Sequence, residues 1–345
     1  MSHVYDFLGP EGWGSYEVSF DGGLQTERVH RPAESILVPA FVDCHIHGAY
    51  GVDFMSATKE EMLTLCRALE RDGYEFFLPT TITDSPDAIQ RALDNLPEHR
   101  MIAGFHLEGP FVSSTYPGAQ PKEKIAEIPT GQSAWSEILD DTRLRLITLA
   151  PEVPHALDLT LKLQKRGVVV SMGHSNATFD EAHQAFEFGA THITHLFNAM
   201  RPFHHREAGL AGFALLQRGV MTEVIYDLKH MTFEAMFLAE RCKGPDEIIG
   251  ISDCTMAAGL APGTRITMWG HECMVGPGEV RLLDGTLAGS GQTLLDIFRN
   301  LYRDFGPELA VKACSLNPRR QLGLPEPKVY LEFSHSLELT RCIPC

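Results

Sequence analysis

Several histidines and acidic residues follow directly on short apolar runs, at the points where β-strands would end. His45 and His47 stand two residues apart, so an extended backbone points both imidazoles to the same side. Imidazoles and carboxylates together suit a divalent metal that binds a hydrolytic water and leaves a position open for a substrate. Each of the other candidates follows a different run; they are Glu108, His174, His195 and Asp253.

Each of these residues alone has a simpler explanation. A single histidine near a strand is more often a hydrogen-bonded structural residue than a ligand, and Asp253 could instead cap the N-terminus of a helix. The joint pattern favours a shared site, because buried imidazoles and charges are costly without a partner. The sequence therefore predicts that several strands deliver ligands to one metal centre.

Such groups can meet only if the apolar runs are neighbouring parallel strands. Each run is followed by a turn and a helical pattern, as in parallel strands that are covered on both faces. Eight runs alternating with helices favour an α/β fold, a (β/α)8 TIM barrel whose site lies at the carboxyl ends of the strands. An open doubly wound sheet is the alternative. The predicted strands are 41–44, 76–81, 102–107, 144–149, 168–172, 191–194, 222–226 and 248–252, and the helices include 59–71, 86–96, 179–188 and 233–241.

The two chain ends lack this alternation. Residues 1–38 contain short alternating patches and glycine turns without a helical period, and residues 324–345 resemble them. We therefore expect a small β domain built from both termini, interrupted by a catalytic barrel over residues 39–323.

Composition limits the class of protein and its partners. A chain of 345 residues with 44% apolar content can bury a large core, and a net charge of −16 argues against nucleic acid and anionic membranes as partners. A signal peptide and a run of about 18 apolar residues are both missing, so we expect a cytoplasmic protein. Eight scattered cysteines indicate reduced thiols, and the Cys342–Cys345 CxxC pair alone is a weak redox or metal signal.

Seven motifs between about residue 38 and residue 324 resemble those of the N-acetylglucosamine-6-phosphate deacetylase family, of the amidohydrolase superfamily. They occur in the family's order. The segments are 41–48, 106–111, 173–178, 194–200, 206–209, 252–259 and 284–290.

The resemblance implies roles for the candidate ligands. Glu108, His174 and His195 would bind the principal metal ion, Zn²⁺ or Fe²⁺. His45 and His47 would form a second set that shares Glu108, or a vestigial, half-occupied site, since some family members lack the pair and work with one ion. With the metal polarising the amide carbonyl, the carboxylate at position 253 would take the proton of the attacking water and pass it to the leaving amine.

The resemblance also places substrate contacts. Arg206, His230 and the backbone around Asn198 and Ala199 occupy the family's phosphate-binding positions, where cations or N–H donors replace the water shell of an anion. Arg206 has an alternative role in a surface ion pair. The family also suggests a homodimer with phosphate groups near the subunit boundary.

Two positions near the predicted substrate contacts depart from the family's pattern. Gln120 stands where a ligand-contacting histidine is usual, and Leu228 stands where glycine is usual. Gln can still donate and accept hydrogen bonds but carries no charge, so it remains a candidate substrate contact. The resemblance implies hydrolysis of N-acetylglucosamine 6-phosphate to glucosamine 6-phosphate and acetate. The alternatives are another N-acyl substrate, such as an N-acetylgalactosamine phosphate or an N-acyl amino acid, and a non-catalytic sugar-phosphate-binding relative.

Overall fold

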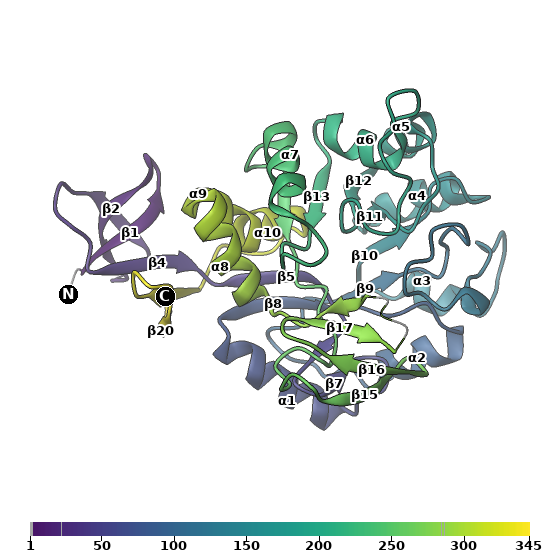
Figure 1. Cartoon of the computed structure of the whole chain (residues 1–345), viewed down its shortest axis with the longest axis horizontal. Coiled ribbons are helices and arrows are strands. Elements are labelled where there is room, and N and C mark those ends of the chain that lie inside the picture. Colours follow the sequence, from purple (N-terminus) through teal and green to yellow (C-terminus); the bar gives the residue numbers. More distant parts are fainter. Residues whose placement is uncertain (1–2, 22, 284, 286) are drawn as a thin grey trace.

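The computed structural model describes residues 3–21, 23–283, 285 and 287–345. Eight strands in parallel ladders form its largest part. Figure 1 shows how the helices surround them. Six of the strands form one sheet in the order β14-β13-β12-β11-β10-β9, and β5 pairs with β8. Consecutive strands are neighbours throughout the six-stranded sheet, without the reversal of order that defines a doubly wound sheet. The strands are β5 (Phe41–Ile46), β8 (Tyr74–Pro79), β9 (Phe105–Glu108), β10 (Leu144–Leu149), β11 (Val169–Met172), β12 (Ala190–Ile193), β13 (Met221–Val224) and β14 (Ile248–Gly250).

Further backbone contacts connect the two parallel sheets. Isolated bridges pair Phe77 with Ile102 and Thr80 with His106, beside β8 and β9. At the other edge, the backbone N–H of Asp253, just after β14, donates to the carbonyl of His45 in β5 at 2.9 Å. The carboxyl ends of all eight strands are therefore brought to one side, as the sequence predicted.

Helices follow most of these strands along the chain. The predicted helix 59–71 is confirmed as α1, which begins at a capping box in which Thr58 and Glu61 satisfy each other's backbone N–H groups. No helix in the described ranges is long and apolar enough to cross a membrane. The helices are α1 (Lys59–Arg71), α2 (Pro86–Asp94), α3 (Ser136–Asp140), α4 (Ala156–Gln164), α5 (Phe179–Glu187), α6 (Gly209–Leu216), α7 (Phe233–Lys243), α8 (Leu294–Phe305), α9 (Pro307–Val311) and α10 (Asn317–Gln321), with a 3₁₀ turn at Lys122–Lys124 and a π-helical turn at Lys312–Leu316.

Both termini form a separate six-stranded sheet, in the order β20-β19-β4-β1-β2-β3. Tyr5, Tyr16 and Tyr330 are buried in its own small core. The CxxC pair lies at its edge, where Cys342 and Cys345 are exposed free thiols outside any strand-to-helix turn. The strands are β1 (His3–Gly9), β2 (Gly12–Ser19), β3 (Gln25–Arg28), β4 (Ser35–Pro39), β19 (Val329–Phe333) and β20 (Leu339–Pro344).

An antiparallel sheet, formed by the part of the chain that follows β14 and precedes α8, was not predicted. Its strands, in the order β15-β16-β17-β18, bury a small apolar cluster that includes Val275 and Val280. Within the predicted motif 284–290, Asp284 and Thr286 lie outside the described residues, and the end of the motif forms β18. The strands are β15 (Arg265–Met268), β16 (His271–Val275), β17 (Glu279–Leu282) and β18 (Leu287–Ser290), and a short hairpin of β6 (Gly48–Ala49) and β7 (Val52–Asp53) follows β5.

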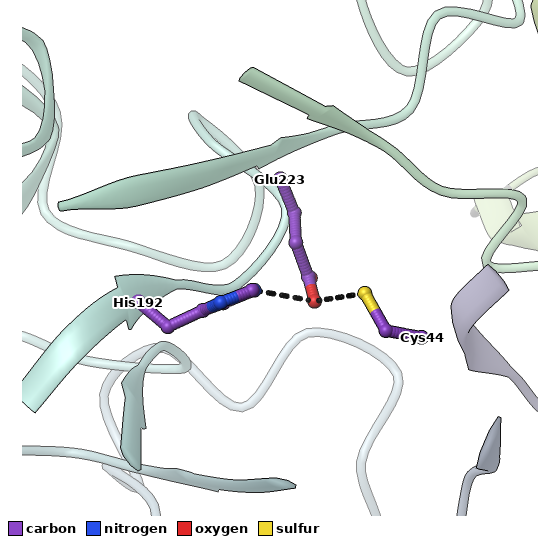
Figure 2. A group of neighbouring side chains, drawn as sticks. All are labelled: Cys44, His192 and Glu223. Atoms are coloured by element: carbon purple, nitrogen blue, oxygen red, sulfur yellow. Dashed lines mark hydrogen bonds and ion pairs between the residues drawn. The ribbon is translucent and has the colours of Figure 1, made fainter. Parts of the chain in front are cut away.

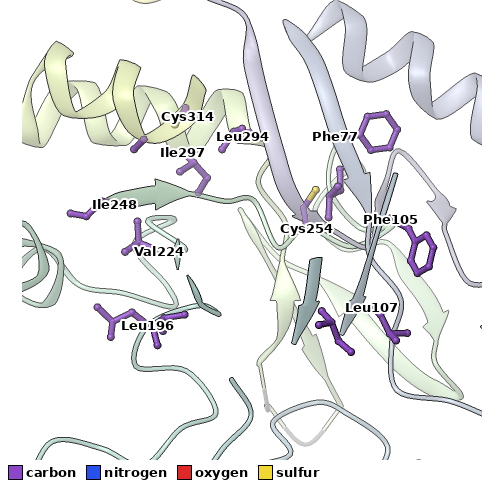
Figure 3. Close-up of a cluster of buried hydrophobic side chains, with 14 of the residues drawn as sticks. Phe77, Phe105, Leu107, Leu196, Val224, Ile248, Cys254, Leu294, Ile297 and Cys314 are labelled. Carbon is purple, nitrogen blue, oxygen red and sulfur yellow. The ribbon is translucent and has the colours of Figure 1, made fainter. Parts of the chain in front are cut away.

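The main apolar core joins the parallel strands to the helices. Figure 3 shows Leu294 and Ile297 of α8 in this cluster together with Ile248 of β14. A second, smaller cluster includes Val42 and Leu78 and extends from strand to strand. Burial of these side chains fixes the strand ends that carry the polar residues described below.

A buried ion pair closes the opposite end of the strands. The guanidinium of Arg319 in α10 donates to Glu75 Oε2 at 2.8 Å, the Lys328 backbone N–H donates to Oε1 at 3.0 Å, and both side chains of the pair are about 5% exposed. We expect Glu75→Gln to lower the free energy of unfolding by about 3–5 kcal/mol, because it leaves a buried guanidinium without its countercharge. Denaturant titration checks this value; a loss below about 1 kcal/mol would contradict it.

Candidate active site

The predicted ligands all lie at the carboxyl ends of the parallel strands. His45 is in β5 and His47 follows it, and Glu108 ends β9. The other two predicted ligands, His174 and His195, follow β11 and β12, and the predicted proton carrier Asp253 follows β14. The five predicted metal ligands are at most 5% exposed, and the Asp253 side chain is 13% exposed. Their donor atoms form two groups, Glu108 with His174 and His195, and His45 with His47 and Asp253.

Glu108 is the centre of the first group. Its Oε1 lies 2.9 Å from His174 Nε2 and 3.2 Å from His195 Nε2. The two imidazole nitrogens are themselves 3.0 Å apart, so two ring nitrogens and one carboxylate oxygen converge on a single point.

The same carboxylate faces the second group. Glu108 Oε1 is 3.4 Å from His45 Nε2, and Oε2 is 3.3 Å from His47 Nε2. Asp253 Oδ1 lies 3.4 and 3.3 Å from the same two nitrogens. Glu108 therefore lies between the two groups, as expected for a carboxylate shared by two ions.

These residues fit a divalent cation. Among the described residues, His45 Nε2 is fully buried and has no hydrogen-bond partner, although carboxylate oxygens lie 3.4 Å away. Buried polar atoms normally have a partner. An imidazole nitrogen that points between carboxylates is well placed to bind a metal ion. Nitrogen and oxygen donors in this number suit a catalytic metal with an open position.

The electrostatics of the site also favour a cation. Burial lowers the pKa of His47, but hydrogen bonds and charges from Asp253 and Glu108 outweigh burial and raise the pKa to about 9. Burial raises the pKa of Glu108, yet His45 and His174 hold it well below its usual range. The ionised carboxylates of Glu108 and Asp253 in this buried site thus attract positive charge, either protons or metal ions.

Strained backbone marks the same residues. His174, His195 and Asp253 have φ values of 45°, 29° and 45°, and Ala199 has 46°. The left-handed region is uncommon for residues other than glycine, and such strain gathers at functional sites.

The other ring nitrogen of three ligands is fixed by a specific acceptor. His47 Nδ1 is 3.1 Å from the Thr80 carbonyl, and His174 Nδ1 is 3.0 Å from the Pro117 carbonyl. His45 Nδ1 lies 3.0 Å from Glu223 Oε2. These contacts hold the rings so that Nε2 faces the centre of the site.

A cavity of about 270 Å³ opens onto both groups. Four predicted substrate contacts line it, whereas Arg206 does not; the four are Asn198, Ala199, His230 and Gln120. Arg206 lies on an exposed segment, and its guanidinium contacts His205 Nε2 at 2.7 Å. Its role toward phosphate stays a prediction.

Gln120 contacts a ligand directly. Its amide donates to Glu108 Oε2 at 2.7 Å and accepts from the Thr83 backbone N–H at 2.7 Å. The side chain therefore lines the cavity and is also hydrogen-bonded to the Glu108 carboxylate. It supports the position of Glu108, in addition to any contact with a substrate.

His230 is also anchored on one side. Its Nδ1 lies 2.7 Å from Asp227 Oδ2; burial lowers the pKa of this imidazole, but the Asp227 carboxylate outweighs burial and raises it. Leu228, between them in sequence, has a φ of 62° and a half-exposed side chain. The leucine thus adopts the conformation that glycine usually takes, and the loop keeps His230 at the cavity.

Sequence reasoning missed two residues of the site. Trp269, in the β15–β16 turn, lines the cavity, packs edge-on against the His47 ring and donates its indole N–H to Asp53 Oδ2 at 3.0 Å. Glu223 contacts His45, as described above. A carboxylate within the apolar run 222–226 was a signal, because a buried charge needs a partner; the tryptophan gave no comparable signal.

The chain is similar to known proteins of one family. Residues 36–332 match the model of the amidohydrolase family. The N-acetylglucosamine-6-phosphate deacetylase of Lysinibacillus sphaericus is 37% identical over 84% of this chain and 76% of its own length, and the N-acetylgalactosamine-6-phosphate deacetylase of Escherichia coli O157:H7 is 34% identical over 94% and 90%.

A solved structure extends the comparison to three dimensions. A mutant N-acetyl-D-glucosamine-6-phosphate deacetylase of Mycobacterium smegmatis, in complex with N-acetyl-D-glucosamine-6-phosphate, matches with a TM-score of 0.89 and 30% identity, over 100% of this chain and 97% of that chain. The matching family model, the relatives and the site together show that the chain belongs to the amidohydrolases, in the N-acetylglucosamine-6-phosphate deacetylase family.

Proposed function

We propose that this protein hydrolyses the N-acetyl group of N-acetylglucosamine 6-phosphate, releasing acetate and glucosamine 6-phosphate. The observation that carries the proposal is Glu108, shared by two imidazole-containing groups at the cavity. Relatives named for this reaction, together with the substrate bound to the M. smegmatis mutant, support it.

The cofactor in this proposal is Zn²⁺ or Fe²⁺, with one ion held by Glu108, His174 and His195. A second would be held by His45 and His47. A bound divalent ion polarises the amide carbonyl and makes water a better nucleophile near neutral pH. Both groups offer nitrogen and oxygen donors, which suit either metal.

In this mechanism Asp253 moves the proton. Its Oδ1 lies 3.4 Å from His45 Nε2 and 3.3 Å from His47 Nε2. The carboxylate would take a proton from the attacking water and then deliver it to the amine nitrogen as the C–N bond breaks. His230 and the backbone around Asn198 and Ala199 would bind the phosphate, and the Trp269 ring would pack against the sugar.

N-acetylgalactosamine 6-phosphate is the second candidate substrate. The E. coli relative with that name matches over 90% of its own length. Gln120 and Leu228 stand where the family usually has histidine and glycine, and Gln120 lines the cavity, so recognition of the phosphate or of a sugar hydroxyl would differ from the family's usual pattern.

An acetate-release screen tests the proposal. N-acetylglucosamine, N-acetylgalactosamine and N-acetylmannosamine are each supplied with and without the 6-phosphate, to enzyme reconstituted with Zn²⁺ or Fe²⁺. We expect the highest kcat/KM for N-acetylglucosamine 6-phosphate. Acetate release from none of these compounds, by protein that holds its metal, would overturn the proposal.

Arg206→Ala is expected to raise KM for a phosphorylated substrate far more than it lowers kcat. A contact with phosphate is equal in ground and transition states, and a charge-assisted hydrogen bond contributes about 1.5–3 kcal/mol. The result is a loss of about 10- to 100-fold in kcat/KM, with little change for the unphosphorylated sugar. Equal losses on both substrates would remove Arg206 from phosphate binding.

We further propose a homodimer in which Arg206 lies at the subunit boundary. The residue is exposed and outside the cavity of its own chain, which leaves it free to serve a neighbouring site. Mixing Arg206→Ala chains with Asp253→Asn chains should then restore activity, since one site of a mixed dimer regains both groups. Activity equal to the sum of the two separate variants would contradict this arrangement.

The fold in this proposal is a closed (β/α)8 barrel over residues 39–323, with a small β domain from residues 1–38 and 324–345. The hydrogen bond from Asp253 to His45 supports closure between β14 and β5. We also infer a cytoplasmic location, because all eight cysteines are free thiols, the state that a reducing compartment maintains.

A further inference from the structure

A fully buried polar cluster lies directly behind the active site. Figure 2 shows that His192 of β12 and Cys44 of β5 both contact one carboxylate oxygen of Glu223 in β13. His192 Nε2 donates to Glu223 Oε1 at 3.0 Å, and the Cys44 thiol donates to the same oxygen at 3.6 Å. All three side chains are at most 1% exposed, so none of them can reach a substrate.

The other oxygen of this carboxylate contacts both halves of the active site. Glu223 Oε2 accepts from His45 Nδ1 at 3.0 Å and from the His195 backbone N–H at 3.2 Å. The backbone carbonyl of Glu223 accepts from the Leu196 N–H at 2.8 Å. One residue in β13 therefore holds a ligand from each of the two groups around Glu108.

The contact between Glu223 and His45 determines which ring nitrogen of His45 is free to bind a metal ion. A proton held on Nδ1 by Glu223 leaves Nε2 with its lone pair, directed toward Glu108 and Asp253. In the other tautomer Nε2 would carry the proton and could not bind a cation. A buried negative charge next to the ring also makes the imidazole a stronger ligand.

We propose that Glu223 is a positioning residue that fixes the His45 tautomer and so makes the second metal position, formed by His45 and His47, a functional one. This inference rests on the proposed metal-dependent function. It decides between the two roles open to the HxH pair, a second site and a vestigial one.

A third metal ion in the Cys44–His192–Glu223 cluster is a different possibility that the contacts disfavour. The thiol and the imidazole N–H already share one carboxylate oxygen, while the other oxygen is occupied by His45 and His195. A metal there would have to displace hydrogen bonds that satisfy every oxygen of the carboxylate. The experiment distinguishes this outcome as well.

The test measures Zn²⁺ binding rather than activity. Wild-type protein and variants are stripped with a chelator, reconstituted with Zn²⁺ and desalted; bound zinc is counted by mass spectrometry, and each Kd is measured by competition with a chromophoric chelator. We expect two ions in the wild type. Glu223→Leu, which removes the acceptor, should lose the weaker ion and keep the one at Glu108, His174 and His195.

Glu223→Gln is the conservative variant and is informative even if Glu223→Leu fails to fold. The amide keeps one acceptor oxygen for His45, and His192 can change tautomer because its Nδ1 has no partner among the described residues. The charge is lost, however, so the Kd of the second ion should rise by about 10- to 100-fold.

Two variants serve as controls. Glu75→Gln makes the same change to a buried carboxylate at the other end of the strands, and should destabilise the protein while leaving both zinc ions in place. Cys44→Ser keeps a donor to Glu223 Oε1 and should likewise bind two ions.

Each other outcome has a distinct meaning. An unchanged Kd of the second ion in Glu223→Gln would overturn the inference, as would a wild type that binds a single ion at saturating Zn²⁺. Three ions in the wild type, one of them lost in Cys44→Ser, would overturn it in favour of a metal in the cluster. A wild type that binds no zinc, and no iron when Fe²⁺ replaces Zn²⁺ in the reconstitution, would instead overturn the proposed function itself.

Discussion

Asp253→Asn is expected to lower kcat for acetate release by about 10²- to 10⁴-fold, the usual contribution of a general acid/base group. The amide has nearly the same shape but cannot accept the proton of the attacking water. Asp253 Oδ1 is 3.3–3.4 Å from the His45 and His47 nitrogens, whereas the group of Glu108, His174 and His195 does not include it. The variant should therefore still hold the ion of that group.

The measurement combines steady-state acetate release with a metal count on the same preparation. Asp158→Asn, an exposed carboxylate in the first turn of α4, is the matched control and should retain the wild-type rate. A near wild-type kcat in Asp253→Asn would exclude this residue as the proton carrier. A slow variant that also lacks metal would assign Asp253 to metal binding instead.

The parts of the fold that could be predicted are those in which local sequence and tertiary packing agree. Helix 59–71 has both the capping residues Thr58 and Glu61 and an apolar stripe, and the structure reproduces its bounds. The parallel strands are buried on both faces and so appear as apolar runs. By contrast, β15 to β18 are four or five residues long and partly exposed, so their alternation is too short to recognise.

The site divides in the same way. Residues that immediately follow a strand, such as His174 and Asp253, could be located from sequence because the fold brings strand ends together. Contacts that depend on loop paths could not. Trp269 reaches His47 across more than two hundred residues, and Gln120 lies behind Glu108 only because the loop after β9 turns back toward Thr83.

The sequence shows that Glu223 needs a partner, but it does not show which residue that partner is. A lone carboxylate in an apolar strand must be paired, but the partner could be any donor from neighbouring strands. Only the register of β13 against β12 and β14 places it behind His45. Its role therefore follows from the three-dimensional arrangement and not from the residue type.

Glu108→Ala is expected to have the largest effect of any single substitution in the chain. The carboxylate is within 3.4 Å of a ring nitrogen of all four histidine ligands, and it accepts the Gln120 amide at 2.7 Å. Its removal leaves one group with two imidazoles and deprives the other of its shared oxygen. Three protein ligands are the usual minimum for a catalytic metal site. With Asp253 kept for proton transfer, each position is left with two imidazoles, so neither should retain an ion through desalting.

The expected result is zinc or iron below one ion in ten chains and a fall in kcat/KM of at least about 10³-fold, since the metal supplies several kcal/mol to the transition state. Chelated wild-type protein is the control, because returning Zn²⁺ should restore its activity but not that of the variant. His47→Ala is the comparison variant for a ligand of one ion only. It should keep the ion held by Glu108, His174 and His195, whereas loss of a carboxylate shared by both positions should remove both ions. If Glu108→Ala still held an ion at either position, the carboxylate would not bridge the two groups, and the shared-ligand geometry would have to be abandoned for two independent sites.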